Sequence, residues 1–170
     1  YASFGVQKFI ICLGYKGHKI KEYFANLALH QLDMTIGPNG ELEYHGRINF
    51  PWTVSLIDPG LETQTGGRLK LVSDLINTEE FLMTYGDGVA DVDIAKSYIS
   101  HKSSGCLATV TATNPPARFG ALKLDGNRVL QFAEKPKVET GWVNGGFFVL
   151  NKKCLDYIDN SSTIFEQEPL

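Results

Sequence analysis

The sequence predicts an α/β fold with a doubly wound, mainly parallel sheet and an antiparallel hairpin inserted late in the chain. Short apolar and β-branched runs alternate with stretches whose apolar residues recur at helical spacing. Residues 81–85 fit a buried parallel strand that ends abruptly at Gly86-Asp87-Gly88. Asp125-Gly126-Asn127 is a hairpin signal between two further strands. The 170 residues are expected to form a single domain.

The composition excludes several classes of function. A hydrophobic content of 43% and a charged content of 21% are ordinary for a soluble globular protein. The net charge of −3 argues against a general nucleic-acid or membrane binder, which would carry a basic surface. No apolar run approaches the roughly 20 residues that a membrane span needs. Three widely spaced cysteines without a CxxC pair predict reduced thiols in a cytoplasmic protein.

The first half of the chain is expected to alternate between strands and helices. One helix places Ile20, Tyr23, Phe24 and Leu27 on one face. The expected elements are a strand at 9–13, a helix at 18–29, a hairpin of 32–36 and 41–45, a strand at 53–57 and a helix opening at Thr65. The stretch 32–53 carries Tyr44, Phe50 and Trp52, which are expected to be exposed as an interface or as a lid over a base.

The second half adds the inserted hairpin and ends in short helices. After the strand at 81–85, the expected elements are a helix at 91–102, a strand at 106–113, hairpin strands at 118–124 and 128–132, a strand at 142–150 and a short helix at 152–158. Thr163 and Glu166 have capping-box spacing, which predicts the start of a helix at Thr163.

Asp87 is the first candidate for a functional residue. It lies on a turn at the carboxyl end of a strand, the edge at which open α/β sheets bind ligands. Flanking glycines allow positive φ angles and the close approach of a ligand. A carboxylate there suits a divalent cation better than a bare phosphate. The alternative is an aspartate that caps the following helix.

Thr65-Gly66-Gly67-Arg68 is an unusual helix start. Glycine is costly inside a helix unless something packs against the bare backbone. A planar ligand such as a nucleobase would explain the two glycines. Close packing of the helix on the sheet would explain them equally well.

Several short motifs, taken together and in this order, resemble those of the sugar nucleotidyltransferases, whose fold is Rossmann-like. Their variants Thr-Gly-Gly-Arg, Tyr-Gly-Asp-Gly-Val-Ala-Asp and Phe-Glu-Gln-Glu-Pro-Leu are most similar to the glucose-1-phosphate cytidylyltransferases. The motifs begin at Gly14, Thr65, Tyr85, Arg118, Glu134 and Asn144 and extend over essentially the whole chain.

The resemblance implies an enzyme that transfers a cytidylyl group from CTP to α-D-glucose 1-phosphate with the help of Mg²⁺, giving CDP-glucose for deoxysugar synthesis. Asp87 would ligate Mg²⁺, and Asp87 and Lys135 would be the catalytic residues. Gly86, Thr65, Gly66, Gly67 and Arg68 would contact the nucleotide. Gly120, Glu134, Lys135, Asn144 and Gly145 would bind the sugar phosphate. The alternative for Lys135 is a solvated lysine before a proline.

Two departures from the family pattern qualify this reading. The glycine-rich loop with the first strand, and the second metal-binding aspartate, are missing, so we expect a fragment of a homo-oligomeric parent enzyme. The fragment alone is expected to aggregate or be molten, and not to catalyse. Alternatives are a uridylyl- or thymidylyltransferase, and a non-catalytic domain that binds a nucleotide sugar and regulates a partner.

Overall fold

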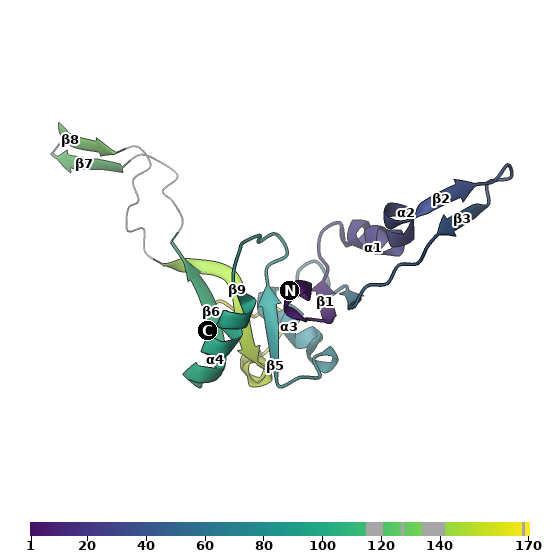
Figure 1. Ribbon diagram of the computed structural model, residues 1–170. Helices are drawn as coiled ribbons and strands as arrows, with labels where there is room; N and C mark the ends of the chain where they lie inside the picture. Colours follow the sequence, from purple (N-terminus) through teal and green to yellow (C-terminus); the bar gives the residue numbers. More distant parts are fainter. Residues whose placement is uncertain (115–120, 127, 134–141, 168) are drawn as a thin grey trace. The chain divides into compact units, whose positions relative to one another are not determined.

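The computed structural model describes residues 1–114, 121–126, 128–133, 142–167 and 169–170. The chain divides into two compact units, each described here by itself (Figure 1). The first unit consists of Tyr1–Glu79 and Lys152–Leu170, and the second of Glu80–Asn151. The prediction of a single domain over residues 1–170 stays a prediction.

The first unit contains one parallel strand pair and one antiparallel hairpin. β1 (Lys8–Cys12) pairs with β4 (Thr53–Ile57) in parallel, and β2 (Asp33–Ile36) pairs with β3 (Leu42–His45) in antiparallel orientation. The helical elements are η1 (Ala2–Phe4), α1 (Gly17–Ala25), α2 (Leu27–Gln31), α3 (Thr65–Leu71), η2 (Ser73–Leu75) and η3 (Lys152–Tyr157). The strands and hairpin predicted for this region are confirmed.

The helix predicted at 18–29 is two helices that meet at Asn26. The Asn26 amide Nδ2 donates to the carbonyl of Glu22 at 2.8 Å, and the Asn26 N–H donates to the same carbonyl. Asparagine side chains compete for backbone groups in this way and so favour helix ends. The prediction of one continuous helix is therefore wrong.

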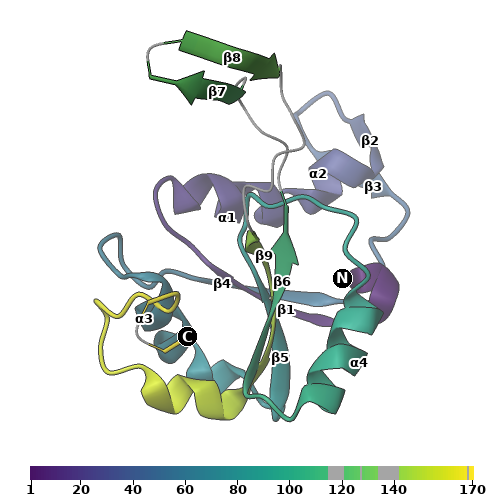
Figure 2. The ribbon, with the colours of Figure 1, turned by 90° about the vertical axis from the view of Figure 1, so that its left-hand side faces the viewer.

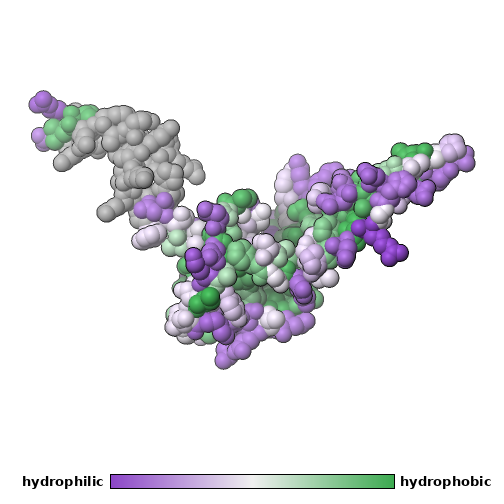
Figure 3. Space-filling view, in the orientation of Figure 1, coloured by the Kyte–Doolittle hydropathy of each residue, from purple (hydrophilic) through white to green (hydrophobic). Residues whose placement is uncertain are grey.

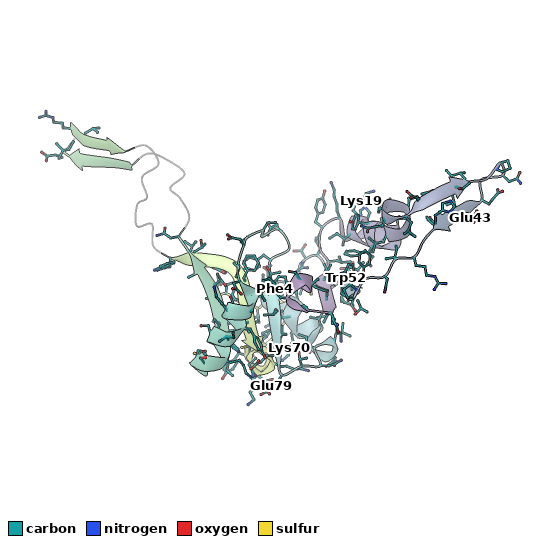
Figure 4. All side chains as sticks on the ribbon, viewed as in Figure 1. Phe4, Lys19, Glu43, Trp52, Lys70 and Glu79 are labelled. Atoms are coloured by element: carbon teal, nitrogen blue, oxygen red, sulfur yellow. The ribbon has the colours of Figure 1, made fainter. Side chains whose placement is uncertain are left out.

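Phe50 and Trp52 are less exposed than the sequence suggested. Their rings stack at 4.3 Å between centroids, and the ring of Trp52, which is labelled in Figure 4, meets that of Phe9 edge-on at 6.2 Å. Both side chains are half-buried, whereas Tyr44 is exposed as predicted.

The β2–β3 hairpin has an exposed apolar patch. Ile36 and Leu42, which pair in the register of the two strands, belong to it (Figure 3).

The core of the first unit lies where α3 meets the end of the chain. Its buried apolar side chains are Leu13, Leu69, Val72, Ile76, Cys154, Leu155, Ile158 and Phe165. Two lysines add hydrogen bonds between these segments. Lys70 Nζ donates to the carbonyl of Leu155 at 2.9 Å, and Lys152 Nζ donates to the carbonyl of Ile76 at 2.6 Å. Burial of these side chains is the main favourable term for the unit.

Residues 161–162 and 165–167 form turns and 163–164 are irregular, so the prediction of a helix starting at Thr163 is wrong. The Glu166 carboxylate accepts a hydrogen bond from the Thr65 hydroxyl at 2.6 Å. The Thr163 hydroxyl accepts from the Asn160 N–H at 3.3 Å. Tertiary hydrogen bonds thus use the two side chains that a capping box would have joined.

The second unit is built around β9 (Val143–Asn151). β9 lies between β5 (Glu80–Thr84) and β6 (Ala108–Thr113) and is antiparallel to both (Figure 1; Figure 2 shows the same strands from a second direction). The prediction that residues 81–85 form a parallel strand is therefore wrong, although the strand itself is confirmed. Phe147, Phe148, Val149 and Leu150 of β9 are buried, and because successive side chains of a strand point to opposite faces, both faces of this strand are out of solvent here.

α4 (Ile94–Ser104) and a second hairpin complete the unit. α4 contacts β6 and β9, and its buried His101 hydrogen-bonds through Nδ1 to the Thr109 hydroxyl at 2.8 Å. β7 (Ala121–Asp125) and β8 (Arg128–Ala133) form the predicted antiparallel hairpin. The α/β class is confirmed.

No helix in the described part of the chain is long and apolar enough to cross a membrane.

Candidate active site

Asp87 lies on a tight turn directly after β5. The N–H of Gly88 donates to the carbonyl of Tyr85 at 3.4 Å, which closes the turn over Gly86 and Asp87. The Asp87 side chain is exposed and makes no hydrogen bond or ion pair with any residue that the structure describes. The predicted position of this carboxylate at the end of a strand is confirmed.

Asp87 does not cap the following helix, so the alternative hypothesis for this residue is wrong. The cap of α4 is Asp93, whose carboxylate accepts from the backbone N–H of Lys96 at 3.0 Å. Lys96 lowers the pKa of Asp93 first through this backbone hydrogen bond and then through its ammonium group. Because Asp93 performs the capping, the Asp87 carboxylate stays available for a ligand.

The glycines beside Asp87 provide space rather than unusual backbone angles. Neither Gly86 nor Gly88 has a positive φ angle, so that part of the prediction is wrong. A Cβ atom added to Gly86 would meet no atom within 4 Å. The turn therefore leaves room on the Gly86 side for a group that is larger than a methyl.

The start of β9 lies beside the Asp87 turn. The Tyr85 N–H donates to the carbonyl of Gly146 at 3.2 Å, and the Thr84 hydroxyl donates to the same carbonyl at 3.0 Å. The Asn144 amide Nδ2 donates to the Tyr85 hydroxyl at 2.9 Å. The structure thus brings together Gly86 and Asp87 with Asn144 and Gly145, residues that the sequence assigned to the nucleotide and the sugar.

Gly145 and Gly146 have structural reasons to be glycine. A Cβ atom at Gly145 would lie 2.8 Å from the carbonyl oxygen of Thr111. Gly146 has a φ angle of +80°, and a Cβ atom there would lie 2.8 Å from the Tyr85 ring. Close packing against β6 and Tyr85 therefore accounts for this pair without a ligand.

Gly66 and Gly67 are likewise packed closely, but within the first unit. A Cβ atom at Gly66 would lie 2.7 Å from the carbonyl oxygen of Thr163, and one at Gly67 would lie 2.6 Å from Cα of Ser161. The Gly66 N–H donates to that Thr163 carbonyl at 3.0 Å. Close packing, one of the two explanations for these glycines, is therefore observed. The helix packs there against residues 161–163 and not against the sheet.

Arg68 holds three backbone segments of the first unit. Its Nε donates to the carbonyl of Thr63 at 2.8 Å, Nη1 to that of Leu13 at 2.5 Å and Nη2 to that of Gly60 at 3.5 Å. Burial raises the pKa of the nearby Cys12 thiol, and the positive charge of Arg68 partly opposes this effect. The assignment of residues 65–68 to the nucleotide stays a prediction.

A family model described as nucleotidyl transferase matches residues 2–168 of the chain.

The chain belongs to the nucleotidyl transferase family.

Two curated relatives refine this result. Glucose-1-phosphate cytidylyltransferase of Salmonella typhi is 51% identical over 100% of this chain and 67% of its own length. A probable glucose-1-phosphate cytidylyltransferase of Bacillus subtilis is 38% identical with the same coverage. The chain therefore spans about two thirds of the length of these relatives. The predicted resemblance to this branch of the nucleotidyltransferases is confirmed.

A solved structure supports the fold. HddC from Yersinia pseudotuberculosis superposes with a TM-score of 0.61 at 24% identity, covering 96% of this chain and 64% of that chain. At this identity the likeness establishes the α/β nucleotidyltransferase fold alone. Gly120, Glu134 and Lys135 lie outside the described residues, so their roles in this nucleotidyltransferase stay predictions.

The described residues of this nucleotidyltransferase agree with a metal ion that takes most of its ligands from the substrate and few from the protein. Among them, no group of three or more His, Cys, Asp or Glu side chains could hold an ion by itself. Mg²⁺ is usually bound by one or two carboxylates together with substrate phosphates and waters. A single exposed carboxylate with unused lone pairs, such as that of Asp87, matches this mode of binding.

Sequence reasoning missed two side-chain contacts, that of Tyr85 with Asn144 in the second unit and that of Glu166 with Thr65 in the first. Tyr85 immediately precedes the Gly86-Asp87 turn, a position from which a strand side chain reaches its neighbour across the sheet. The contact of Glu166 with Thr65 joins residues that are distant in the sequence, and no local pattern announces it.

Proposed function

We propose that the protein catalyses nucleotidyl transfer from CTP to α-D-glucose 1-phosphate, giving CDP-glucose and pyrophosphate. The observation that carries this proposal is the 51% identity to a glucose-1-phosphate cytidylyltransferase across the whole chain. The position of Asp87 beside Asn144 and Gly145 at one end of the β5–β9 pair agrees with it. In this arrangement a metal-bound phosphate and a sugar would lie next to each other.

The reaction exchanges one phosphate ester for another without oxidation or reduction. A phosphate oxygen of glucose 1-phosphate attacks the α-phosphorus of CTP in line and forms the new P–O bond. The bond from that phosphorus to the bridging oxygen of the β-phosphate breaks, and pyrophosphate leaves with the electron pair. Because both reactants are polyanions, the main barrier is charge repulsion and positioning.

The proposal gives each candidate residue a role; for Gly120, Glu134 and Lys135 that role comes from the resemblance alone. Asp87 would hold Mg²⁺ with its carboxylate, and the ion would supply positive charge to offset the negative charge of the phosphates. Asn144 offers its exposed amide to hydroxyl groups of the sugar. Lys135 supplies a positive charge to the sugar phosphate, and Glu134, Gly120 and Gly145 complete the sugar site.

The nucleotide belongs, in this proposal, beside Thr65, Gly66, Gly67 and Arg68. The hydrogen bonds of Arg68 to three carbonyls and the close packing of the two glycines support a rigid backbone there. A rigid surface loses little conformational entropy when it binds a base.

The proposal also includes the finer fold assignment, which is one doubly wound and mainly parallel sheet with β7–β8 inserted. A homo-oligomeric parent enzyme and a cytoplasmic location belong to the same proposal.

A nucleotide panel tests the proposal. The full-length protein is incubated with glucose 1-phosphate, Mg²⁺ and CTP, UTP, dTTP or GTP in turn, and pyrophosphate release is measured. We expect kcat/KM to be highest with CTP and to require glucose 1-phosphate. Preference for another nucleotide would replace the cytidylyl assignment. Binding of CDP-glucose without turnover would favour the regulatory domain over the enzyme.

A further inference from the structure

The side-chain amide of Asn144 is held at both of its ends. The backbone N–H of Gly146 can only donate, so the group that it meets at 2.8 Å is the amide oxygen Oδ1 of Asn144. The nitrogen Nδ2 therefore faces the opposite way and donates to the Tyr85 hydroxyl at 2.9 Å. The chemistry of the two partners thus selects one of the two orientations that an amide could take.

Asn144 retains hydrogen-bonding capacity after these two bonds. A carboxamide has two N–H donors and two oxygen lone pairs. Contacts with the described residues use one of each. The side chain is exposed, so one donor and one acceptor of the amide remain at the surface. This pair matches a sugar hydroxyl, which can accept one hydrogen bond and donate another.

The Tyr85 ring is itself fixed in place. It meets the ring of Phe148 edge-on, with 5.8 Å between centroids and an interplanar angle of 65°. The backbone of Gly146 passes so close to the ring that no Cβ atom would fit between them. The Tyr85 N–H is bonded to the same residue. The hydroxyl that receives Asn144 is therefore held by β9 and by the start of the Asp87 turn together.

We propose that Tyr85 is a positioning residue for the sugar acceptor. Its hydroxyl, together with the Gly146 N–H, locks the Asn144 amide so that one N–H and one lone pair of Oδ1 face a hydroxyl of the bound sugar. Tyr85 also begins the turn that carries Asp87. The same residue therefore fixes the position of the Asn144 amide relative to the Asp87 carboxylate. This inference rests on the proposed function.

The test is Tyr85→Phe, which removes the hydroxyl and keeps the ring. In the full-length protein we expect KM for glucose 1-phosphate to rise about three- to tenfold, the effect of one neutral hydrogen bond, while KM for CTP changes less than about twofold. Tyr157→Phe, at an exposed tyrosine of the first unit, is the matched control and should change neither constant. An unchanged sugar KM in Tyr85→Phe would overturn the inference.

A double-mutant cycle separates positioning from a general structural role. If Tyr85 acts through Asn144, Tyr85→Phe should have no further effect on the sugar KM in the Asn144→Ala background. Additive effects of the two substitutions would overturn the inference. Thr84→Val removes a neighbouring hydrogen bond to the Gly146 carbonyl and should lower Tm without changing the ratio of the two KM values.

A third measurement needs only the wild-type protein and so does not depend on the folding of a variant. The side-chain amide protons of Asn144 are assigned by NMR in the wild-type protein, from their through-bond connection to the Asn144 backbone. We expect one proton to exchange slowly with solvent because it is bonded to Tyr85, whereas two equally fast protons would contradict the proposal. If the wild-type protein showed no transfer from any nucleotide, the proposed function would fail first, and the amide measurement would still report on Tyr85.

Discussion

The hydroxyl of Thr65 links the start of α3 to the end of the chain. It donates to the Glu166 carboxylate at 2.6 Å and accepts from the Phe165 N–H at 3.0 Å. Phe165 is fully buried at this point, so the hydroxyl anchors a core residue as well as a carboxylate. A residue predicted to contact the nucleotide is therefore also a structural link within the first unit.

Replacing Thr65 tests this link. Thr65→Val should lower the free energy of unfolding by about 1–3 kcal/mol, because it removes the hydrogen bonds that the hydroxyl makes with the Glu166 carboxylate and the Phe165 N–H. Thr65→Ser keeps the hydroxyl and should cost much less. Denaturant unfolding of both variants measures the difference. Equal losses in the two variants would mean that the hydroxyl contributes no more than the methyl group, and would contradict this prediction.

Gly67→Ala should destabilise the protein although alanine is the better helix former. The gain in helix propensity is at most about 1 kcal/mol, whereas overpacking costs about 1–3 kcal/mol. Overpacking prevails here because the added Cβ would lie 2.6 Å from Cα of Ser161, and backbone cannot move aside as a flexible side chain can. Thermal melting of the variant checks the sign.

Gly86→Ala is the matched control for that substitution. Gly86 has no positive φ angle and no atom within 4 Å of an added Cβ, so Tm should stay within about 1 °C of the wild type. If the nucleotide passes this turn, the same methyl group should raise KM for CTP. A loss of stability comparable to that of Gly67→Ala would show that the space beside Gly86 is filled.

Asp93 should make stability depend on pH in acid. Its pKa is lowered in the folded state from an ordinary value of 3.8, so its contribution is present above that value and is lost as the pH falls through the folded pKa. The difference in Tm between the wild type and Asp93→Ala should therefore be largest near neutral pH and shrink below about pH 4. A difference that is constant from pH 7 to pH 3 would exclude this linkage.

Asp87→Asn should weaken catalysis through the metal. The amide keeps the shape of the side chain but loses the charge that attracts Mg²⁺, so the Mg²⁺ concentration for half-maximal activity should rise at least about tenfold. Asp93→Asn is the control, because asparagine also caps helices and this carboxylate faces Lys96. A chelator should abolish the wild-type activity, and re-addition of Mg²⁺ should restore it.

The sequence was informative where local chemistry decides the structure. Alternating apolar runs located the strands, and Gly86-Asp87-Gly88 located the turn that carries the carboxylate. It was less informative where tertiary contacts compete with local preference. The capping-box pair Thr163 and Glu166 is used by other partners, and Asn26 divides a helix whose apolar face is continuous.

Strand direction was also beyond the reach of local patterns. A continuous apolar run such as that of β5 is typical of a parallel strand, yet β5 is antiparallel to β9, and only this pairing determines the direction. For the same reason the packing role of Gly66 and Gly67 could not be separated from a ligand-binding role, because their neighbours at 161–163 come from the far end of the chain.

The central place of β9 has a consequence for how specificity can change. The strand carries Asn144 at one end and four buried residues at the other, and it pairs with a neighbour along each edge. A new acceptor preference is therefore easier to acquire by altering groups around this amide than by moving it, since displacement would disturb two rows of backbone hydrogen bonds. Diversification among such enzymes should concentrate in the loops facing β9, with the strand itself acting as a fixed reference for the acceptor.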